Sequence, residues 1–116
     1  MSRSSLPPEL FGVVAERFRA LAEPARLNLL HTLQSGECTV TELVTETGLA
    51  QANVSKHLQV LYDKGFVTRR KEGLFTYYRL AGRDVFKLCD IMCGRLKAEA
   101  SVFRRRIGAG EIRGRR

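Results

Sequence analysis

The sequence has no long hydrophobic run, and it is poor in cysteine and histidine. Its first residues are polar, and Pro7 and Pro8 lead directly into a short apolar stretch, so neither a signal peptide nor a membrane span is expected. We therefore expect a cytoplasmic protein with no membrane partner, in which cysteines stay reduced and structural disulfides are rare. The 116 residues show no internal repeat and fit one domain.

The usual sequence signs of an enzyme are also missing. The chain has no glycine-rich phosphate loop, no carboxylate pair and no Ser/His/Asp arrangement. Its two histidines are His31 and His57, so Cys/His chemistry would have to bring Cys38 close to one of them. We do not expect an enzyme.

Acidic residues are outnumbered by basic ones, 12 to 20, which gives a net charge of +8. Residues 101–116 alone hold six arginines and one glutamate. These arginines would add nonspecific attraction to DNA or form a solvated end. Because glycines interrupt any helix there, we expect a domain at 8–107, a basic flexible tail at 108–116 and a flexible N-terminus at 1–7.

A polar face in the middle of the chain points to nucleic acid. Val54, Leu58 and Leu61 follow at i, i+4 and i+7, which predicts a buried stripe on a helix from about Gln51 to Lys64. The opposite face would carry amides, a hydroxyl and a cation that suit base edges and phosphates. These residues are Ala52, Asn53, Ser55, Lys56 and Gln59. An ordinary amphipathic surface helix is the alternative for this stretch.

The preceding segment favours a helix-turn-helix. Thr39 and Glu42 have the spacing of a capping box, which predicts a short helix that starts at this point. Gly48 can adopt the left-handed conformation that ends such a helix and turns the chain into the next one. Ala50 and Gln51 are weak N-caps, so the start of the second helix is less well specified than its middle.

The following segment predicts a β-hairpin. Residues 67–71 and 74–80 are rich in β-branched and aromatic side chains, and Glu72 and Gly73 separate them. The basic side chains of this hairpin would form a charged wing beside the helix or remain a solvated surface. They are Arg69, Arg70, Lys71 and Arg79.

Two further helices are expected at the ends of the domain. One should run from about Pro8, a favourable first-turn residue, to Leu21, and the other from about Asp84 to Ile107. The second carries an apolar stripe at helical spacing, which needs a partner surface. The stripe consists of Val85, Leu88, Cys89, Met92, Leu96 and Phe103.

From about Phe18 to Leu80 the chain resembles the ArsR/SmtB family of small bacterial winged-helix repressors. Three segments carry the resemblance in order: RFRALAEPARLNLLHTL (17–33), VSKHLQVLYDKGFV (54–67) and RRKEGLFTYYRL (69–80). The resemblance implies a mainly α fold with a small β-hairpin, a winged helix-turn-helix of about five helices. It also implies a symmetric homodimer, formed through the first and last helices, that binds double-stranded DNA at an imperfectly palindromic operator.

The resemblance implies DNA contacts from both the helix and the wing. The implied residues are Gln51, Asn53, Ser55, Lys56, His57, Arg70 and Lys71. For His57, a packed position at the helix edge is the alternative. A winged helix that binds only proteins is the alternative for the whole domain, and it would lack salt-dependent DNA affinity.

The three cysteines are the candidate effector site. Cys89 and Cys93 are spaced i, i+4, which is too far for an unstrained disulfide but suits two thiolates that share one ion. Thiolate ligands select soft ions. Trivalent arsenic or antimony would require three sulfur ligands, and Cys38 is the candidate third ligand from elsewhere in the dimer.

The resemblance also sets aside the familiar metal sites. Many metal-sensing members carry C-V-C-D-L where this chain has TVTEL (39–43), and residues 84–107 contain no histidine for a zinc or nickel site. A sulfur site in another place remains, as in some arsenic-sensing members. We therefore expect a repressor that releases its operator when a thiophilic metal ion, first of all trivalent arsenic, binds the cysteines.

Two alternatives for the cysteines remain open. Cys38 could pair with one helix cysteine in a thiol redox or sulfide-responsive switch, as in some family members. Cys89 and Cys93 could instead be small apolar residues in the dimer core, because both lie on or beside the apolar stripe.

Overall fold

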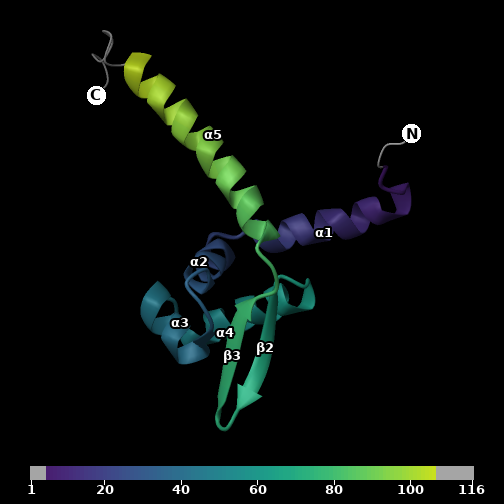
Figure 1. Cartoon of the computed structure of the whole chain (residues 1–116), viewed down its shortest axis with the longest axis vertical. Coiled ribbons are helices and arrows are strands. Elements are labelled where there is room, and N and C mark those ends of the chain that lie inside the picture. The colour runs from purple at the N-terminus through teal and green to yellow at the C-terminus, as the bar shows by residue number, and fades with distance from the viewer. Residues whose placement is uncertain (1–4, 107–116) are drawn as a thin grey trace. The chain divides into compact units, whose positions relative to one another are not determined.

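The computed structural model describes residues 5–106. The chain divides into two compact units, one up to Gly82 and one from Arg83 onward. In the first unit a hairpin extends away from a group of short helices (Figure 1). Within residues 5–106 no helix is both long and apolar enough to cross a membrane.

The first unit begins with two helices that start at prolines. A 3₁₀ turn, η1 (Pro8–Leu10), leads directly into α1 (Phe11–Leu21), so the predicted first helix is confirmed with a tighter first turn. Helix α2 (Pro24–Leu33) follows after two residues. Proline suits both starts because its missing N–H would lack a helical partner there in any case.

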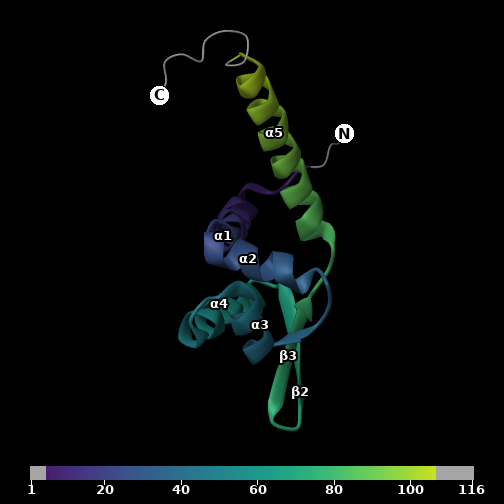
Figure 2. The same ribbon diagram turned by 90° about the vertical axis from the view of Figure 1, so that its left-hand side faces the viewer.

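The predicted helix-turn-helix is present as α3 (Val40–Thr47) and α4 (Gln51–Asp63). Thr39 Oγ1 accepts a hydrogen bond from the Glu42 amide at 3.1 Å, and Glu42 Oε1 accepts one from the Thr39 amide at 2.8 Å, so the capping box is confirmed. Gly48 has φ 76° and donates its amide to the Val44 carbonyl, which ends α3 as predicted. Figure 2 shows α3 and α4 beside each other.

The sheet has one strand more than the sequence predicted. Strands β2 (Val67–Glu72) and β3 (Phe75–Leu80) form the hairpin, and the two-residue strand β1 (Cys38–Thr39) pairs with β3, which gives the order β1-β3-β2. The tight turn is Gly73-Leu74 rather than the predicted Glu72-Gly73, because Glu72 pairs with Phe75. Gly73 has φ 62°, the conformation that favours glycine at this turn.

The core of the first unit lies between α2, α3, α4 and the base of β2. Its largest fully buried side chains are aliphatic, and each is at most 2% exposed. Burial of each such side chain stabilises the fold by roughly 1.5–3 kcal/mol. They are Leu29, Leu30, Leu33, Leu43, Val54, Leu58, Leu61 and Val67.

The second unit contains helix α5 (Asp84–Arg106). The predicted end at Ile107 and the predicted tail at 108–116 lie outside the described residues, as do residues 1–4. Val85 and Phe86 are buried, whereas most of the predicted apolar stripe is exposed in the single chain. The exposed members of the stripe are Leu88, Met92, Leu96 and Phe103.

Candidate nucleic-acid interface

Helix α4 presents its polar face to solvent, as its sequence predicted. Val54, Leu58 and Leu61 have no exposed surface, so the helix is anchored along one side. The opposite side carries the exposed amide, hydroxyl and ammonium groups of Gln51, Asn53, Ser55, Lys56 and Gln59. Anchoring on one side fixes which way these groups point, and their chemistry suits base edges and phosphates.

The start of α4 leaves backbone donors without a side-chain cap. Ala50 is the N-cap residue and has no side chain that could accept a hydrogen bond, as expected from the sequence. The unpaired first-turn N–H groups of a helix attract anions, including phosphate. The exposed Gln51 and Asn53 lie in this first turn.

His57 differs from its neighbours on α4 because it is only 9% exposed. Its Nδ1 accepts a hydrogen bond from Arg26 Nε at 3.1 Å. Burial lowers the pKa of His57, and the nearby positive charges of Arg26 and Lys56 lower it further. The geometry therefore favours the packed alternative for His57, and a DNA contact by this residue stays a prediction.

Arg69 connects the wing to α4. Its guanidinium carbon lies 3.8 Å from the centre of the Tyr62 ring, and one terminal nitrogen donates to Gln59 Oε1 at 3.2 Å. Gln59 in turn donates to Asp63 Oδ1 at 2.8 Å. Gln59 is therefore engaged by the wing on one side and by its own helix on the other.

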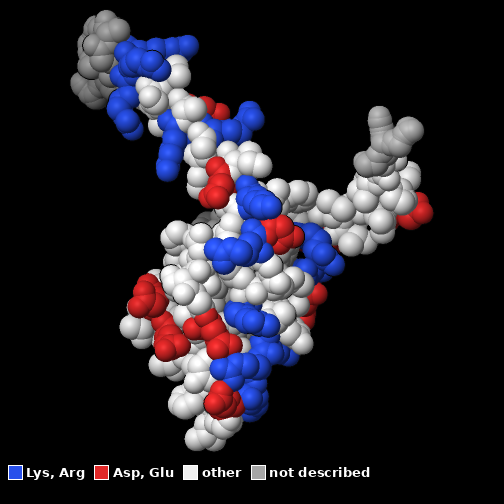
Figure 3. Space-filling view, viewed as in Figure 1, with Lys and Arg blue, Asp and Glu red and all other residues white. Residues whose placement is uncertain are grey.

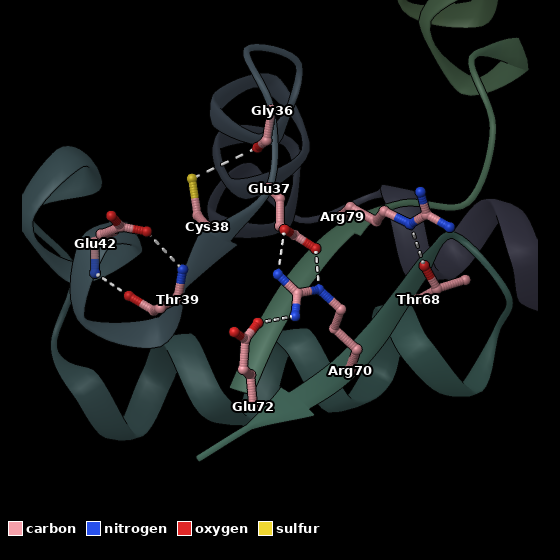
Figure 4. A network of polar contacts seen from close by, with 9 residues as sticks. All are labelled: Gly36, Glu37, Cys38, Thr39, Glu42, Thr68, Arg70, Glu72 and Arg79. Atoms are coloured by element: carbon pink, nitrogen blue, oxygen red, sulfur yellow. Dashed lines mark hydrogen bonds and ion pairs between the residues drawn. The ribbon is translucent and has the colours of Figure 1, made fainter. Parts of the chain in front are cut away.

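Arg70 is held by two carboxylates (Figure 4). Its Nε and one terminal nitrogen donate to the two oxygens of Glu37 at 2.9 and 2.8 Å, and its other terminal nitrogen pairs with Glu72. The hydrogen bonds from Arg70 lower the pKa of Glu37, and the same contacts raise the pKa of Arg70. The cation predicted to contact phosphate is thus paired within the protein.

Lys71 and Arg79, two other basic side chains of the wing, form no ion pair within residues 5–106. Arg79 Nε donates to the neutral Thr68 hydroxyl at 3.3 Å, and Lys71 is exposed and has no hydrogen bond or ion pair within residues 5–106. Figure 3 shows basic side chains along the hairpin with carboxylates among them. This surface is therefore positive but not uniformly so.

The cysteines lie in both units. Cys38 begins β1 and donates its thiol to the Gly36 carbonyl at 3.6 Å. Burial raises the pKa of Cys38 and that of Cys89, and Cys93 and Asp90 add to the shift at Cys89. Within residues 5–106 of the single chain, no three His, Cys, Asp or Glu side chains are grouped to hold a metal ion. A site completed by a second chain stays a prediction.

Two contributors to this region were not predicted from the sequence. Arg26 lies within the segment 17–33 that resembles the family, and no sequence pattern marks Glu37. Each binds a residue at least 31 positions away, His57 and Arg70 respectively. Local periodicity carries no signal for such pairs, because the contact depends on how the helices and the hairpin pack.

A family model described as bacterial regulatory protein, arsR family, matches residues 23–69. The HTH-type transcriptional regulator Rv0324 of Mycobacterium tuberculosis is 42% identical over 68% of this chain and 35% of its own length. The probable mercury resistance operon repressor of Streptomyces lividans is 48% identical over 51% of this chain and 47% of its own length. The chain thus spans less than half the length of these two relatives.

Two further comparisons cover most of the length of the compared protein. The arsenical resistance operon repressor of Bacillus subtilis is 32% identical over 66% of this chain and 74% of its own length. The solution structure of a homodimeric winged helix-turn-helix DNA-binding domain from Mycobacterium bovis has a TM-score of 0.70 and 35% identity. That match covers 84% of this chain and 90% of the other.

Proposed function

The chain belongs to the arsR family of bacterial regulatory proteins, and from this premise we propose that it is a homodimeric transcriptional repressor in the cytoplasm. It binds double-stranded operator DNA and releases it when a thiophilic ion binds its cysteines. The observation that carries the DNA-binding part is the exposed polar face of α4 beside the basic hairpin. The relatives are named as regulators and repressors rather than enzymes.

In this proposal α4 lies in the major groove and the wing follows the phosphate backbone. Gln51, Asn53 and Ser55 read base edges, and Lys56 and Lys71 contact phosphates. The uncapped first turn of α4 adds backbone donors for a phosphate. Direct contact of these side chains with DNA requires no rearrangement, because all five are already exposed.

The proposed dimer forms through α1 and α5. Both helices leave large apolar side chains exposed in the single chain, among them Phe11 and Phe18 on α1 and Met92 and Leu96 on α5. Exposed apolar surface of this extent is typical of association surfaces. Two-fold symmetry would place the two α4 helices in successive major grooves about 34 Å apart, on an imperfectly palindromic operator.

The DNA-binding proposal is tested by fluorescence anisotropy on a labelled duplex from just upstream of the coding sequence, with a random duplex as comparison. We expect affinity that falls with salt, and Lys56→Gln should reduce the slope of log K against log[salt] by about 0.9. Asn53→Ala should reduce the preference for the upstream duplex by about 1–3 kcal/mol. Lys87→Gln, which removes a cation outside α4 and the wing, is the matched control.

Absence of salt-sensitive binding to either duplex would overturn the repressor proposal. The protein would then be a winged helix that binds other proteins. Equal affinities of Asn53→Ala and the unaltered protein for both duplexes would instead exclude Asn53 as a base-reading residue.

The effector proposal is supported by thiol chemistry and by two relatives. Cys89 and Cys93 are separated by one helical turn, a spacing from which two thiolates can bind one ion. Burial raises the pKa of Cys89, so ligation must displace the proton, which strongly thiophilic ions achieve. The relatives named as mercury and arsenical resistance repressors make thiophilic ions the first effectors to test.

Release would follow from a shift between two dimer conformations. An ion held by Cys89 and Cys93, with Cys38 as the candidate third ligand from elsewhere in the dimer, would favour a dimer conformation in which the two α4 helices no longer match the operator. A coupling free energy of roughly 1–3 kcal/mol changes DNA affinity 5- to 150-fold, which is enough for induction.

The effector proposal is tested by adding arsenite to the reduced protein bound to the upstream duplex. We expect release at about one arsenite per three cysteines, and Cys89→Ser and Cys93→Ser variants that bind DNA but do not release it. Release of DNA from both variants would contradict the proposed metalloid site. Release by a thiol oxidant or by a sulfane sulfur donor, but not by arsenite, would establish the redox alternative.

A further inference from the structure

We propose that Glu37 and Arg70 form a clamp that positions the wing for DNA, so that Arg70 acts as a positioning residue and not as a phosphate contact. The inference deepens the proposed DNA-binding function and rests on it. Glu37 is the residue that it adds to the functional surface.

The clamp joins two parts of the chain that are far apart in sequence. Glu37 lies between α2 and β1, 33 positions before Arg70 in the middle of β2. The pair is bidentate, with Nε–Oε2 and Nη2–Oε1 distances of 2.9 and 2.8 Å, and this geometry needs the planar fork of arginine. Figure 4 shows Glu37 reaching from the loop to Arg70 on the wing.

The sheet register places all members of the clamp on one face. Arg70 pairs with Tyr77 on β3, and Tyr77 pairs with Thr39 on β1, so these three residues share a face. Glu37 precedes Thr39 by two positions and reaches the same face. The Arg70 guanidinium carbon lies 4.5 Å from the centre of the Tyr77 ring, which fixes the arginine from a second direction.

Arg69 secures the opposite face of the same strand. It stacks on Tyr62 and donates to Gln59, both on α4. Adjacent residues on a strand point to opposite faces, so Arg69 attaches the wing to the recognition helix and Arg70 attaches it to the loop before β1. Thr39 also caps α3, so the clamp orients the wing relative to the whole helix-turn-helix.

The charge balance argues against a phosphate role for Arg70. Both terminal nitrogens and Nε are already directed at carboxylate oxygens, so a phosphate would have to displace Glu37 or Glu72. Lys71, the next residue, is exposed and has no charged partner within the described chain. In the wing, the unpaired Lys71 is therefore available to contact phosphate, and the paired Arg70 beside it orients the wing.

The test compares DNA affinity and its salt dependence for Glu37→Gln, Arg70→Gln, Arg70→Lys and the double variant Glu37→Gln/Arg70→Gln, on the labelled upstream duplex. A clamp predicts that each single variant weakens binding by about 3- to 10-fold and that the double variant is no worse than either. Arg70→Lys should lose as much as Arg70→Gln, because lysine keeps the charge but lacks the fork. The salt slope should stay unchanged.

Glu72→Gln is the matched control. Like Glu37→Gln, it removes one carboxylate partner of Arg70 and one negative charge. Glu72 differs from Glu37 because it lies in the hairpin itself, so its ion pair does not connect the wing to another part of the chain. We expect its affinity to stay within about twofold of that of the unaltered protein. Circular dichroism melting verifies that every variant is folded.

The opposite results would identify Arg70 as a phosphate contact. In that case Arg70→Lys would retain affinity, Arg70→Gln would lower the salt slope by about 0.9, and Glu37→Gln would strengthen binding by freeing the arginine. Any one of these three results overturns the clamp while the repressor proposal stands. Failure of the unaltered protein to bind DNA would overturn both.

Discussion

Arg26 Nε donates a hydrogen bond to His57 Nδ1 across 3.1 Å, and this bond joins α2 to the buried edge of α4. A terminal nitrogen of the same guanidinium donates to the Ala20 carbonyl at 3.3 Å, near the end of α1. One side chain therefore connects three helices. The connection needs an unprotonated Nδ1 on His57, since a protonated nitrogen cannot accept a hydrogen bond.

This bond predicts that the protein loses stability in mild acid. The pKa of His57 is lowered in the folded state, first by burial and then by the charges of Arg26 and Lys56. Below the ordinary histidine pKa of about 6.5, the unfolded chain therefore binds a proton that the folded chain does not. His57 therefore contributes fully to the free energy of unfolding above its ordinary pKa. This contribution declines as the pH falls from the ordinary pKa to the lowered pKa of the folded state.

Urea unfolding at several pH values between 5 and 8 measures the effect. We expect the free energy of unfolding to change less with pH in His57→Gln than in the unaltered protein. His31→Gln removes the other histidine, which lies exposed on α2 and has no hydrogen bond to Arg26 within residues 5–106, and serves as control. An equal reduction in both variants would contradict the assignment to His57.

The capping box predicts a specific loss of stability. Thr39→Ala removes the oxygen that accepts from the Glu42 amide, which should lower the free energy of unfolding by about 1 kcal/mol. Thr39→Ser and Glu42→Gln keep acceptors at both positions and should retain most of that stability. Chemical denaturation midpoints compare the variants. If serine were as destabilising as alanine, the methyl group and not the cap would be the important feature.

The apolar stripe on α5 predicts a dimer that one charge disrupts. Leu96 is 56% exposed in the single chain, and Leu96→Asp should weaken association at least tenfold, roughly, because a carboxylate would be buried without a partner. Sedimentation equilibrium measures the association constant. Lys87→Asp introduces the same side chain on the opposite face of the helix and should leave the dimer intact. A dimeric Leu96→Asp variant would assign association to another surface.

The cysteine environments predict slow alkylation. Burial raises the pKa of Cys38 and Cys89, so fewer thiolates are present at neutral pH than in an unfolded chain. Iodoacetamide should therefore react more slowly with each in the folded protein than in urea, and the folded rates should rise at higher pH. Variants with a single cysteine separate the sites. Faster alkylation in the folded state would contradict the raised pKa values of these thiols and favour the thiol redox switch.

The sequence determined the elements whose signals are local. Val54, Leu58 and Leu61 were assigned to the buried side of α4 from their spacing alone, and all three are buried. Thr39, Glu42 and Gly48 were assigned to the ends of α3 by capping chemistry, and the structure has each in that role. These assignments succeed because helix periodicity and caps involve residues within one or two turns of each other.

Tertiary structure alone decided which polar side chains remain exposed and which are paired within the protein. His57 and Arg70 belong to the segments that resemble the family's reading helix and wing, yet Arg26 holds one and Glu37 the other. The strand β1 was also beyond sequence reasoning, because two residues have no periodicity and become a strand only by pairing with β3. Contacts of this kind depend on the distance between packed elements, and residue spacing along the chain does not contain that distance.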